Sequence, residues 1–320
     1  MHAPTVAVVI PSWNTAAHLP ACLESLAGQA PALETLVVDN GSTDGSLDYL
    51  EREAVPHVPL PENVGFAAAV NLGVARTEAA AVLVLNADTV LEPGCVEALR
   101  TALDADSGLG GVQPRILQLE GEATQRSAPD ARLYSAGQAL TRDGRALERG
   151  MGEEQRPELL ERREVFGVCG AACLLRRELF ADLGGYDESY FAFYEDVDLN
   201  VRARIADRRF EYVPEAVVWH VGNAAWTAGF ERPSADNARL VARNRLSTQL
   251  KFMPLSATPR IAAVELGALG RAARERRFRA TLRGKLEGLR RLPALLRERR
   301  ALRASGDPAR ARAWLGRASC

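Results

Sequence analysis

The chain has 320 residues, of which 47% are hydrophobic and 25% are charged. This composition is typical of a soluble globular protein and excludes a disordered, collagen-like or disulfide-scaffold chain. The 40 basic and 41 acidic residues nearly cancel, but residues 260–320 hold 17 of the basic and only 5 of the acidic ones, a net charge of +12, and residues 1–259 carry −13.

Short apolar runs alternate with helix-like segments through the first hundred residues, a pattern that predicts parallel strands joined by crossover helices. We expect strands at 6–10, 34–38, 57–60 and 81–85, and helices at 16–27, 44–53, 66–75 and 93–103. This arrangement is Rossmann-like. The one candidate for a dinucleotide-binding loop, 108–113, has Gln113 in place of the third glycine, so we expect a plain loop there.

The second half of the chain begins with a polar segment, 120–164, which lacks apolar periodicity and predicts an exposed hairpin or flexible excursion. Beyond it we expect strands at 170–175 and 210–220 and helices at 194–206 and 234–252. Pro254 and Pro259 then mark a boundary. We therefore divide the chain into a main α/β domain, 1–255, and a basic helical extension, 256–320.

Five scattered cysteines include no C-x-x-C pair, so we expect reduced thiols rather than a zinc or redox site. The first residues lack the features of a signal peptide, and no run of about 18 apolar residues occurs. These observations predict a cytoplasmic protein.

Polar residues follow the first two predicted strands: Ser12 and Asn14 after one, Asp39 after the other. Ligands of open α/β sheets bind beyond these strand ends, where Asp39 could accept a hydrogen bond from a pyrimidine or a ribose hydroxyl. An Asx turn and a helix N-cap explain Ser42 and Asp44, and they are an equally good interpretation of Asp39.

Two further positions suit a metal ion. Asp88 follows a buried strand, where a carboxylate can hold a hard divalent cation together with substrate phosphates, although a turn aspartate is an equal alternative. His220 ends a predicted strand. A lone histidine is more often structural than a ligand.

Glu195, Asp196 and Asp198 crowd three carboxylates into four positions at a predicted helix start. A helix dipole needs only one or two of them, and like charges at this spacing repel. The crowding favours a functional role, such as a general base that acts on a hydroxyl group.

The ordered segments PSWN, VVDNGSTDGS, NVGFAAAVNLG, LNAD, GAACLLRRELF, GGYDESYFAFYEDVDLNVR and YVPEAVVWHVG together resemble glycosyltransferase family 2 enzymes of GT-A fold. The resemblance covers roughly residues 4–250. It is strongest to the branch of bacterial rhamnosyltransferases and galactofuranosyltransferases that build surface polysaccharides.

The resemblance implies a role for each site residue. The donor nucleotide sugar would be bound by the following residues: Pro11, Ser12, Asn14, Asp39, Asn63, Gly65, Asn86 and Asp88. Asp88 and His220 would hold Mg²⁺ or Mn²⁺, Asp196 would be the catalytic base, and Glu195 and Asp198 would support the acceptor side.

The implied reaction is a single inverting displacement, in which an acceptor hydroxyl attacks the anomeric carbon of a UDP- or dTDP-sugar, with rhamnose or galactofuranose as the sugar. The acceptor would be a glycan or a polyprenyl-diphosphate-linked sugar.

Two departures from the family pattern stand out. Val70 precedes Asn71 where the family often has a second asparagine, and Asn86 replaces the first acid of the metal motif, which predicts weaker metal binding.

Two rival functions remain. A nucleotidyltransferase would ordinarily show a glycine-rich basic loop near the first strand, and residues 11–20 contain none. A catalytically inactive carbohydrate- or lipid-binding scaffold would have no reason to keep Asp39, Asp88, Asp196 and His220 together.

The extension contains apolar residues at helical spacing, surrounded by arginines: Phe278, Leu282, Leu286 and Leu289. This pattern predicts a basic amphipathic helix. It either packs on the main domain with a solvated arginine face or attaches to anionic lipid on the inner face of the cytoplasmic membrane. We expect no nucleic acid, because no aromatic or recognition-helix pattern accompanies the charge.

Overall fold

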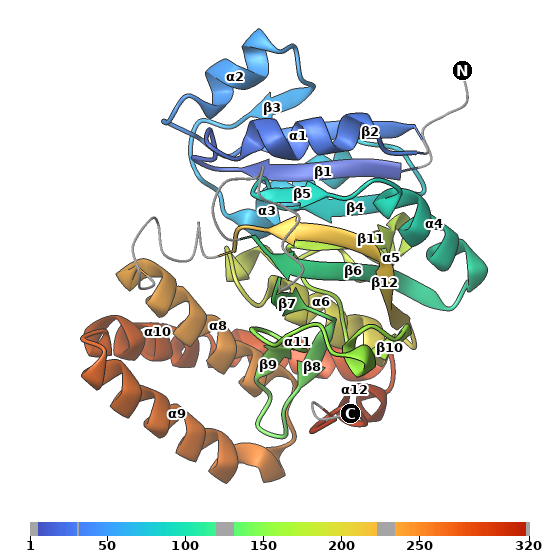
Figure 1. Ribbon diagram of the computed structural model, residues 1–320. Helices are drawn as coiled ribbons and strands as arrows, with labels where there is room; N and C mark the ends of the chain where they lie inside the picture. The colour runs from blue at the N-terminus through green and yellow to red at the C-terminus, as the bar shows by residue number, and fades with distance from the viewer. Residues whose placement is uncertain (1–5, 31, 120–130, 223–233, 318–320) are drawn as a thin grey trace.

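A computed structural model describes residues 6–30, 32–119, 131–222 and 234–317 (Figure 1). Residues 120–130 of the predicted excursion and residues 318–320 of the extension lie outside the described residues. Within the described part of the chain, ten strands form one mixed sheet in the order β10-β12-β6-β11-β4-β1-β2-β3, with β5 paired to β12 and β7 to β6.

The strands of this sheet are β1 (Val6–Ser12), β2 (Leu33–Asp39), β3 (His57–Pro59), β4 (Ala81–Leu85), β5 (Thr89–Leu91), β6 (Leu109–Gln118), β7 (Leu133–Ser135), β10 (Arg163–Val165), β11 (Ala172–Arg176) and β12 (Arg209–His220). A separate hairpin pairs β8 (Gln138–Leu140) with β9 (Ala146–Glu148). The helices are α1 (Leu19–Ala27), α2 (Ser46–Arg52), α3 (Phe66–Ala75), α4 (Cys95–Ala105), α5 (Arg177–Leu183), α6 (Glu195–Ile205), α8 (Ala235–Phe252), α9 (Thr258–Arg274), α10 (Phe278–Arg290), α11 (Leu292–Ser305) and α12 (Pro308–Arg312).

The half of the sheet formed by β3, β2, β1 and β4 is parallel, as the apolar runs predict. Alternate residues of β1 point to opposite faces, so that Val8 and Ile10 join one buried cluster and Val9 joins another. Burial on both faces explains why these strands are continuous apolar runs. The predicted mixed α/β fold is confirmed.

The prediction of a plain loop at 108–113 is wrong, because β6 starts at Leu109 and is a central strand of the sheet. Glycine is needed here for close packing. A side chain at Gly111 would overlap Leu175 and come within 2.9 Å of the Leu174 carbonyl oxygen on β11. The glycines that favoured a loop therefore allow two strands to approach.

The prediction of an exposed hairpin or flexible excursion holds in part for residues 131–164. The strands β8 and β9 form a hairpin, and residues 145–164 are mostly exposed or half-buried. Residues 131–140, however, are mostly buried, and the segment also forms β7, a 3₁₀ turn at Pro157–Leu159 and most of β10. Leu133 is fully buried, and it packs with Leu159 and Trp219 in one cluster. The Tyr212 hydroxyl also donates a hydrogen bond to the Leu159 carbonyl at 2.9 Å. A few buried apolar residues separated by turns, such as Leu133 and Leu159, attach this segment to the sheet, so no apolar period appears in its sequence.

The C-terminal helices pack against α8 and α6. On α10 the buried residues are Thr281, Gly284, Lys285 and Gly288. Glu265 of α9 is paired with Arg245 of α8 at 2.8 Å and with Lys285 of α10. The chain then returns to the β8 hairpin, where the Gly316 amide donates to the Leu140 carbonyl at 2.8 Å. The division into 1–255 and 256–320 stays a prediction.

None of the helices in the described ranges is both long enough and apolar enough to cross a membrane.

The packing of α10 on α8 predicts opposite effects for two glycine-to-alanine changes. A methyl group at Gly284 would overlap the Arg239 carbonyl oxygen, whereas Gly270, inside α9, has no atom within 4 Å of the added carbon. Gly270→Ala should stabilise the protein by up to about 1 kcal/mol through helix propensity. Gly284→Ala should destabilise it by about 1–3 kcal/mol. Urea unfolding of both variants measures the difference, and equal stabilisation would contradict the packing.

Candidate active site

The carboxyl ends of β1, β2 and β4 meet at one edge of the sheet, which faces left in Figure 1. Ser12 at the end of β1 lies opposite Asp39 at the end of β2, and Asn86 follows β4 directly. Parallel pairing therefore collects the polar residues that the sequence places after separate strands. This edge is where ligands of open α/β sheets bind.

Asp39 is 1% exposed and uses only one of its carboxylate oxygens. Its Oδ2 accepts from the Ser42 amide at 3.1 Å, as in an Asx turn, and its Oδ1 has no partner among the described residues. A buried carboxylate oxygen without a donor is costly. Both interpretations of Asp39 are therefore compatible with the structure: one oxygen closes a turn and the other is available to a ligand.

The polar residues around Asp39 are tied to neighbouring loops. The Ser12 hydroxyl lies 2.7 Å from that of Thr15, and Asn14, with φ of 54°, accepts from the Thr43 amide at 2.8 Å. Pro11 lies in β1, one residue before Ser12.

Asn63 and Gly65 shape the loop that leads into α3. The side-chain oxygen of Asn63, Oδ1, accepts hydrogen bonds from the Gly65 backbone amide at 2.9 Å and from Asn40 Nδ2 at 3.0 Å. Gly65 has φ of 93°, and a side chain there would come within 2.6 Å of the Phe191 carbonyl oxygen. The glycine therefore permits contact between this loop and the segment before α6.

Asn86, Asp88 and His220 converge because β5 pairs with the end of β12, which places His220 opposite Thr89. His220 Nε2 lies 3.1 Å from Asp88 Oδ1 and 3.4 Å from Asn86 Nδ2. Burial raises the pKa of Asp88, but the facing His220 outweighs this and lowers the pKa overall. The Tyr134 and His220 rings pack in a T-shaped arrangement, with centroids 4.5 Å apart.

The donor set at this point fits a divalent cation. An imidazole nitrogen and a carboxylate oxygen already face each other, and a cation could take the place of the shared proton between them. Oxygen and nitrogen ligands suit Mg²⁺ and Mn²⁺, with the remaining positions left for water and phosphate. His220 Nδ1 has no partner among the described residues.

A short segment, 169–171, connects the group formed by Asn86, Asp88 and His220 to the carboxylate of Asp196. The Asn86 amide donates to the Ala171 carbonyl at 2.9 Å, and the Gly170 amide donates to Asp196 Oδ2 at 2.9 Å. The backbone amide of Val197 donates a hydrogen bond to Asp196 Oδ1 at 2.7 Å. Burial raises the pKa of Asp196, although these hydrogen bonds oppose the rise.

The three crowded carboxylates at the start of α6 have three different environments. Asp198 is fully buried and paired with Lys251 at 2.7 Å and Arg202 at 2.6 Å. Glu195 is buried, and burial together with repulsion from Asp196 raises its pKa well above the usual range. Asp196 is only half-buried. It is the one member of this trio that a substrate can reach.

The backbone before α6 is strained. Phe191, Phe193 and Tyr194 have φ of 65°, 69° and 73°, values that cost of order 1–3 kcal/mol each for residues other than glycine. The side-chain amide of Asn244, which is fully buried in α8, donates to the carbonyls of Tyr190, Ala192 and Phe193 at 2.9, 2.8 and 2.7 Å. This contact holds the strained segment in place.

The sequence analysis did not find Gln138, Glu148 or Asn244. The side-chain amide of Gln138 donates to Asp196 at 2.8 Å and to Glu148 at 2.9 Å. Gln138 and Glu148 lie in the polar stretch without periodicity, and nothing in the pattern marks them. Asn244 carries a usable signal, since it lies four residues after Leu240 and four before Thr248, on the face of α8 that is buried.

Comparison with known proteins gives a consistent result. The model of the family described as "Glycosyl transferase family 2" matches residues 7–184. The N-acetylglucosaminyl-diphospho-decaprenol L-rhamnosyltransferase of Mycobacterium tuberculosis is 32% identical over 231 residues, which cover 67% of this chain and 75% of that protein. A PGL/p-HBAD biosynthesis glycosyltransferase of Mycobacterium bovis is 30% identical over 210 residues, covering 63% of this chain and 70% of that protein.

Two solved structures share the fold. GalNAc-T7 with UDP, GalNAc and Mn²⁺ aligns with a TM-score of 0.63 at 16% identity, over 79% of this chain and 49% of that one, so this chain spans about half its length. The mannosyltransferase PcManGT from Pyrobaculum calidifontis, with GDP-Man and Mn²⁺, aligns with a TM-score of 0.51 at 18% identity, over 98% of this chain and 78% of that one. These likenesses confirm the predicted GT-A fold.

The contact between Asn244 and the strained segment predicts a large effect for Asn244→Ala, because the Ala192 and Phe193 carbonyls both lose a donor. The Tyr190 carbonyl keeps hydrogen bonds from Arg243 and from the Ala192 amide. We expect a loss of about 2–3 kcal/mol in the free energy of unfolding. Ser247→Ala in the same helix is the matched control, since its buried hydroxyl has no partner among the described residues and should change stability by less than about 0.5 kcal/mol. Urea unfolding compares them, and similar values would contradict the role of Asn244.

Proposed function

The chain belongs to glycosyl transferase family 2 and is a glycosyltransferase, and we propose that it transfers a sugar with inversion from a UDP- or dTDP-sugar. The acceptor is a hydroxyl group of a glycan or of a polyprenyl-diphosphate-linked sugar, and the reaction serves surface-polysaccharide synthesis. The Mycobacterium tuberculosis relative, named for L-rhamnose transfer to a lipid-linked N-acetylglucosamine, supports rhamnose rather than galactofuranose as the sugar. The observation that carries the proposal is the half-buried Asp196, which the segment 169–171 connects to Asn86 and so to the Asp88–His220 pair.

In this proposal the nucleotide lies over the ends of β1 and β2. The unpaired Oδ1 of Asp39 accepts a hydrogen bond from the base, and Pro11, Ser12 and Asn14 line the same pocket. Asn63 and Gly65 keep the neighbouring loop open toward the sugar, and Asn86 lies beside the diphosphate.

Asp196 acts as the general base in this reaction. Three N–H groups hold its carboxylate, from Gly170, Val197 and Gln138, which leaves it oriented and partly open to an acceptor hydroxyl. The acceptor oxygen attacks the anomeric carbon, the bond to the diphosphate breaks, and the hydroxyl proton moves to Asp196. A positioned base of this kind accounts for roughly 10²–10⁴ in rate. Glu195 and Asp198 support the helix start from beneath.

Asp88 and His220 would hold the Mg²⁺ or Mn²⁺ of the family. A bound cation would neutralise negative charge on the departing diphosphate. Only two protein ligands are proposed, because Asn86 stands in place of an acid. This small number of ligands supports weak, exchangeable metal binding.

Two substitutions test the assignment. Asp196→Asn should lower transfer by at least about 10²-fold while the donor still binds, because the amide keeps the shape but cannot take a proton. Asp88→Ala should weaken binding of the UDP- or dTDP-sugar in Mn²⁺ but have little effect in EDTA. Radiolabelled sugar transfer measures the first effect, and thermal shift with each nucleotide sugar measures the second.

The inactive scaffold is the alternative outcome of the same experiments. It predicts no transfer by the unaltered chain and no thermal shift with any nucleotide sugar. Full transfer by Asp196→Asn would instead show that another group is the base.

We also propose that the C-terminal helices attach the enzyme to anionic lipid. Small residues on α10 face α8, so the apolar stripe of Phe278, Leu286 and Leu289 points outward at 42%, 47% and 49% exposure, beside Arg279 and Arg283. An outward apolar stripe flanked by cations suits a membrane interface. In Figure 1, α10 is on the same side of the view as the edge where β1 ends, which would bring a lipid-linked acceptor toward the site.

The stripe predicts that Leu286→Ser with Leu289→Ser weakens binding to phosphatidylglycerol vesicles by about tenfold or more, since each buried leucine contributes more than 1 kcal/mol. Met151→Ser, which removes an apolar residue of similar exposure (51%) elsewhere, should change nothing. Co-sedimentation of the full chain with anionic and neutral vesicles measures this. Unchanged binding of the double variant would rule out the stripe.

A further inference from the structure

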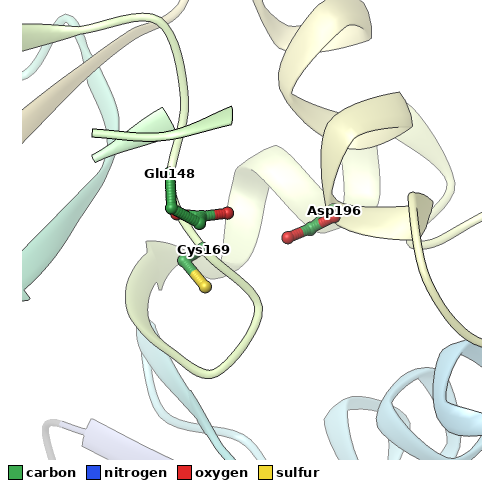
Figure 2. Close-up of side chains that lie close together, drawn as sticks. All are labelled: Glu148, Cys169 and Asp196. Atoms are coloured by element: carbon green, nitrogen blue, oxygen red, sulfur yellow. The ribbon is translucent and has the colours of Figure 1, made fainter. Parts of the chain in front are cut away.

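A second carboxyl group, Glu148, faces Asp196 in the active site. One ligand atom from each of Glu148, Cys169 and Asp196 lies within 4.8 Å of the other two, and Figure 2 shows the carboxyl groups of Glu148 and Asp196 pointing toward one another. Glu148 ends β9 in the hairpin, whereas Asp196 lies in the first turn of α6. Two like charges at this distance need a specific arrangement to hold them.

Gln138 of β8 lies between the two carboxyl groups. Its Nε2 donates to Glu148 Oε1 at 2.9 Å and to Asp196 Oδ2 at 2.8 Å. Its orientation is fixed, because its Oε1 accepts from Asn200 Nδ2 at 2.8 Å, and Asn200 also donates to the Val168 carbonyl at 2.8 Å. Both hydrogens of the Gln138 amide therefore face the carboxyl groups.

The other oxygen of Glu148 has a donor of its own. Gln113 Nε2 and the Gly137 amide donate to Ser135 Oγ at 2.8 and 3.2 Å, so the hydroxyl proton of Ser135 goes to Glu148 Oε2. Gln113 is fixed in turn, since its Oε1 accepts from the Cys169 amide at 2.6 Å. Two glutamines with settled orientations thus define the hydrogen bonds around Glu148.

These donors distinguish between two uses of the cluster. The residue types would suit a cation, but N–H and O–H groups from Gln138, Ser135 and Gly170 point at the carboxyl oxygens that a cation would need. The arrangement is built for carboxyl groups and their protons rather than for an ion.

We propose that Gln138 and Glu148 are positioning residues for Asp196: Gln138 holds its carboxylate toward the acceptor hydroxyl, and the charge of Glu148 makes it a stronger base. The proposal rests on the proposed function of Asp196. No additional bond forms or breaks, since the acceptor proton still moves to Asp196.

The groups around Glu148 determine when its charge appears. Burial and repulsion from Asp196 raise the pKa of Glu148 to about 7. Burial raises the pKa of Cys169 on the neighbouring loop and of Tyr134 on β7 well above their usual values, so both stay neutral. Glu195 on α6 is the other acid beside Asp196, and its pKa is also raised. As Glu148 loses its proton near pH 7, repulsion increases the proton affinity of Asp196, and transfer should speed up.

The test is the pH dependence of kcat, at saturating donor, for the full chain and its variants. The unaltered enzyme should show a rise in kcat centred near pH 7. Glu148→Gln should lose this rise and have a kcat about tenfold lower above pH 7, with the donor KM within about twofold of the original. Glu195→Gln should keep the rise. Glu158→Gln, an exposed change of the same charge in the same part of the chain, should match the unaltered enzyme.

A second variant is needed because Glu148→Gln could disturb the fold: its new NH₂ group could face the N–H group of Gln138. Ser135→Ala keeps both carboxyl groups and removes one donor from Glu148, which should move the rise in kcat to higher pH. Thermal unfolding of each variant checks the fold. Profiles of Glu148→Gln and Ser135→Ala that superimpose on the original would overturn the proposal, while full activity of Asp196→Asn would overturn the assignment of the base itself.

Discussion

The active site depends on a backbone segment that is unfavourable by itself. Phe191, Phe193 and Tyr194 have positive φ, at a summed cost of several kcal/mol, and the Asn244 amide offsets it from α8 with three hydrogen bonds. The segment leads directly into Glu195 and Asp196. The segment that leads into Asp196 is therefore held by a helix about fifty residues away in the chain, so α8 supports the candidate active site.

The basic extension supports the same segment. Arg291 contacts Ser189, and Glu298 of α11 lies 3.0 Å from Lys251, which also pairs with Asp198 beneath the start of α6. The charge asymmetry of the sequence predicts a tail that decides only where the protein works. These contacts add a second role, because the buried Lys251, which pairs with Asp187, Asp198 and Glu298, joins the extension to the helix that carries Asp196.

The sequence predicts those strands and turns that are determined by residues adjacent in the chain. The strand β1 and the turn at Asp39 follow from an apolar run and the polar residues directly after it, so both could be located before the structure was known. Gln138 and Glu148 could not, because their meaning comes from pairing with Asn200 and Asp196 across about sixty and fifty residues. The strand β6 was hidden for another reason: Gly111 is there for the approach of Leu175, and glycine alone favours a loop.

The carboxylates of α6 show why crowding in a sequence indicates function but does not assign it. Asp198 lies against Lys251 and Arg202, so its charge is fully compensated. Glu195 is buried with no cation paired to it in the described part of the chain, and burial raises its pKa, which favours the neutral form. Asp196 accepts hydrogen bonds from uncharged N–H donors and remains partly exposed, so a substrate can meet its carboxylate. A helix turn points successive side chains in different directions, and the three surroundings, rather than the three identities, make Asp196 the proposed base and the other two its proposed supports.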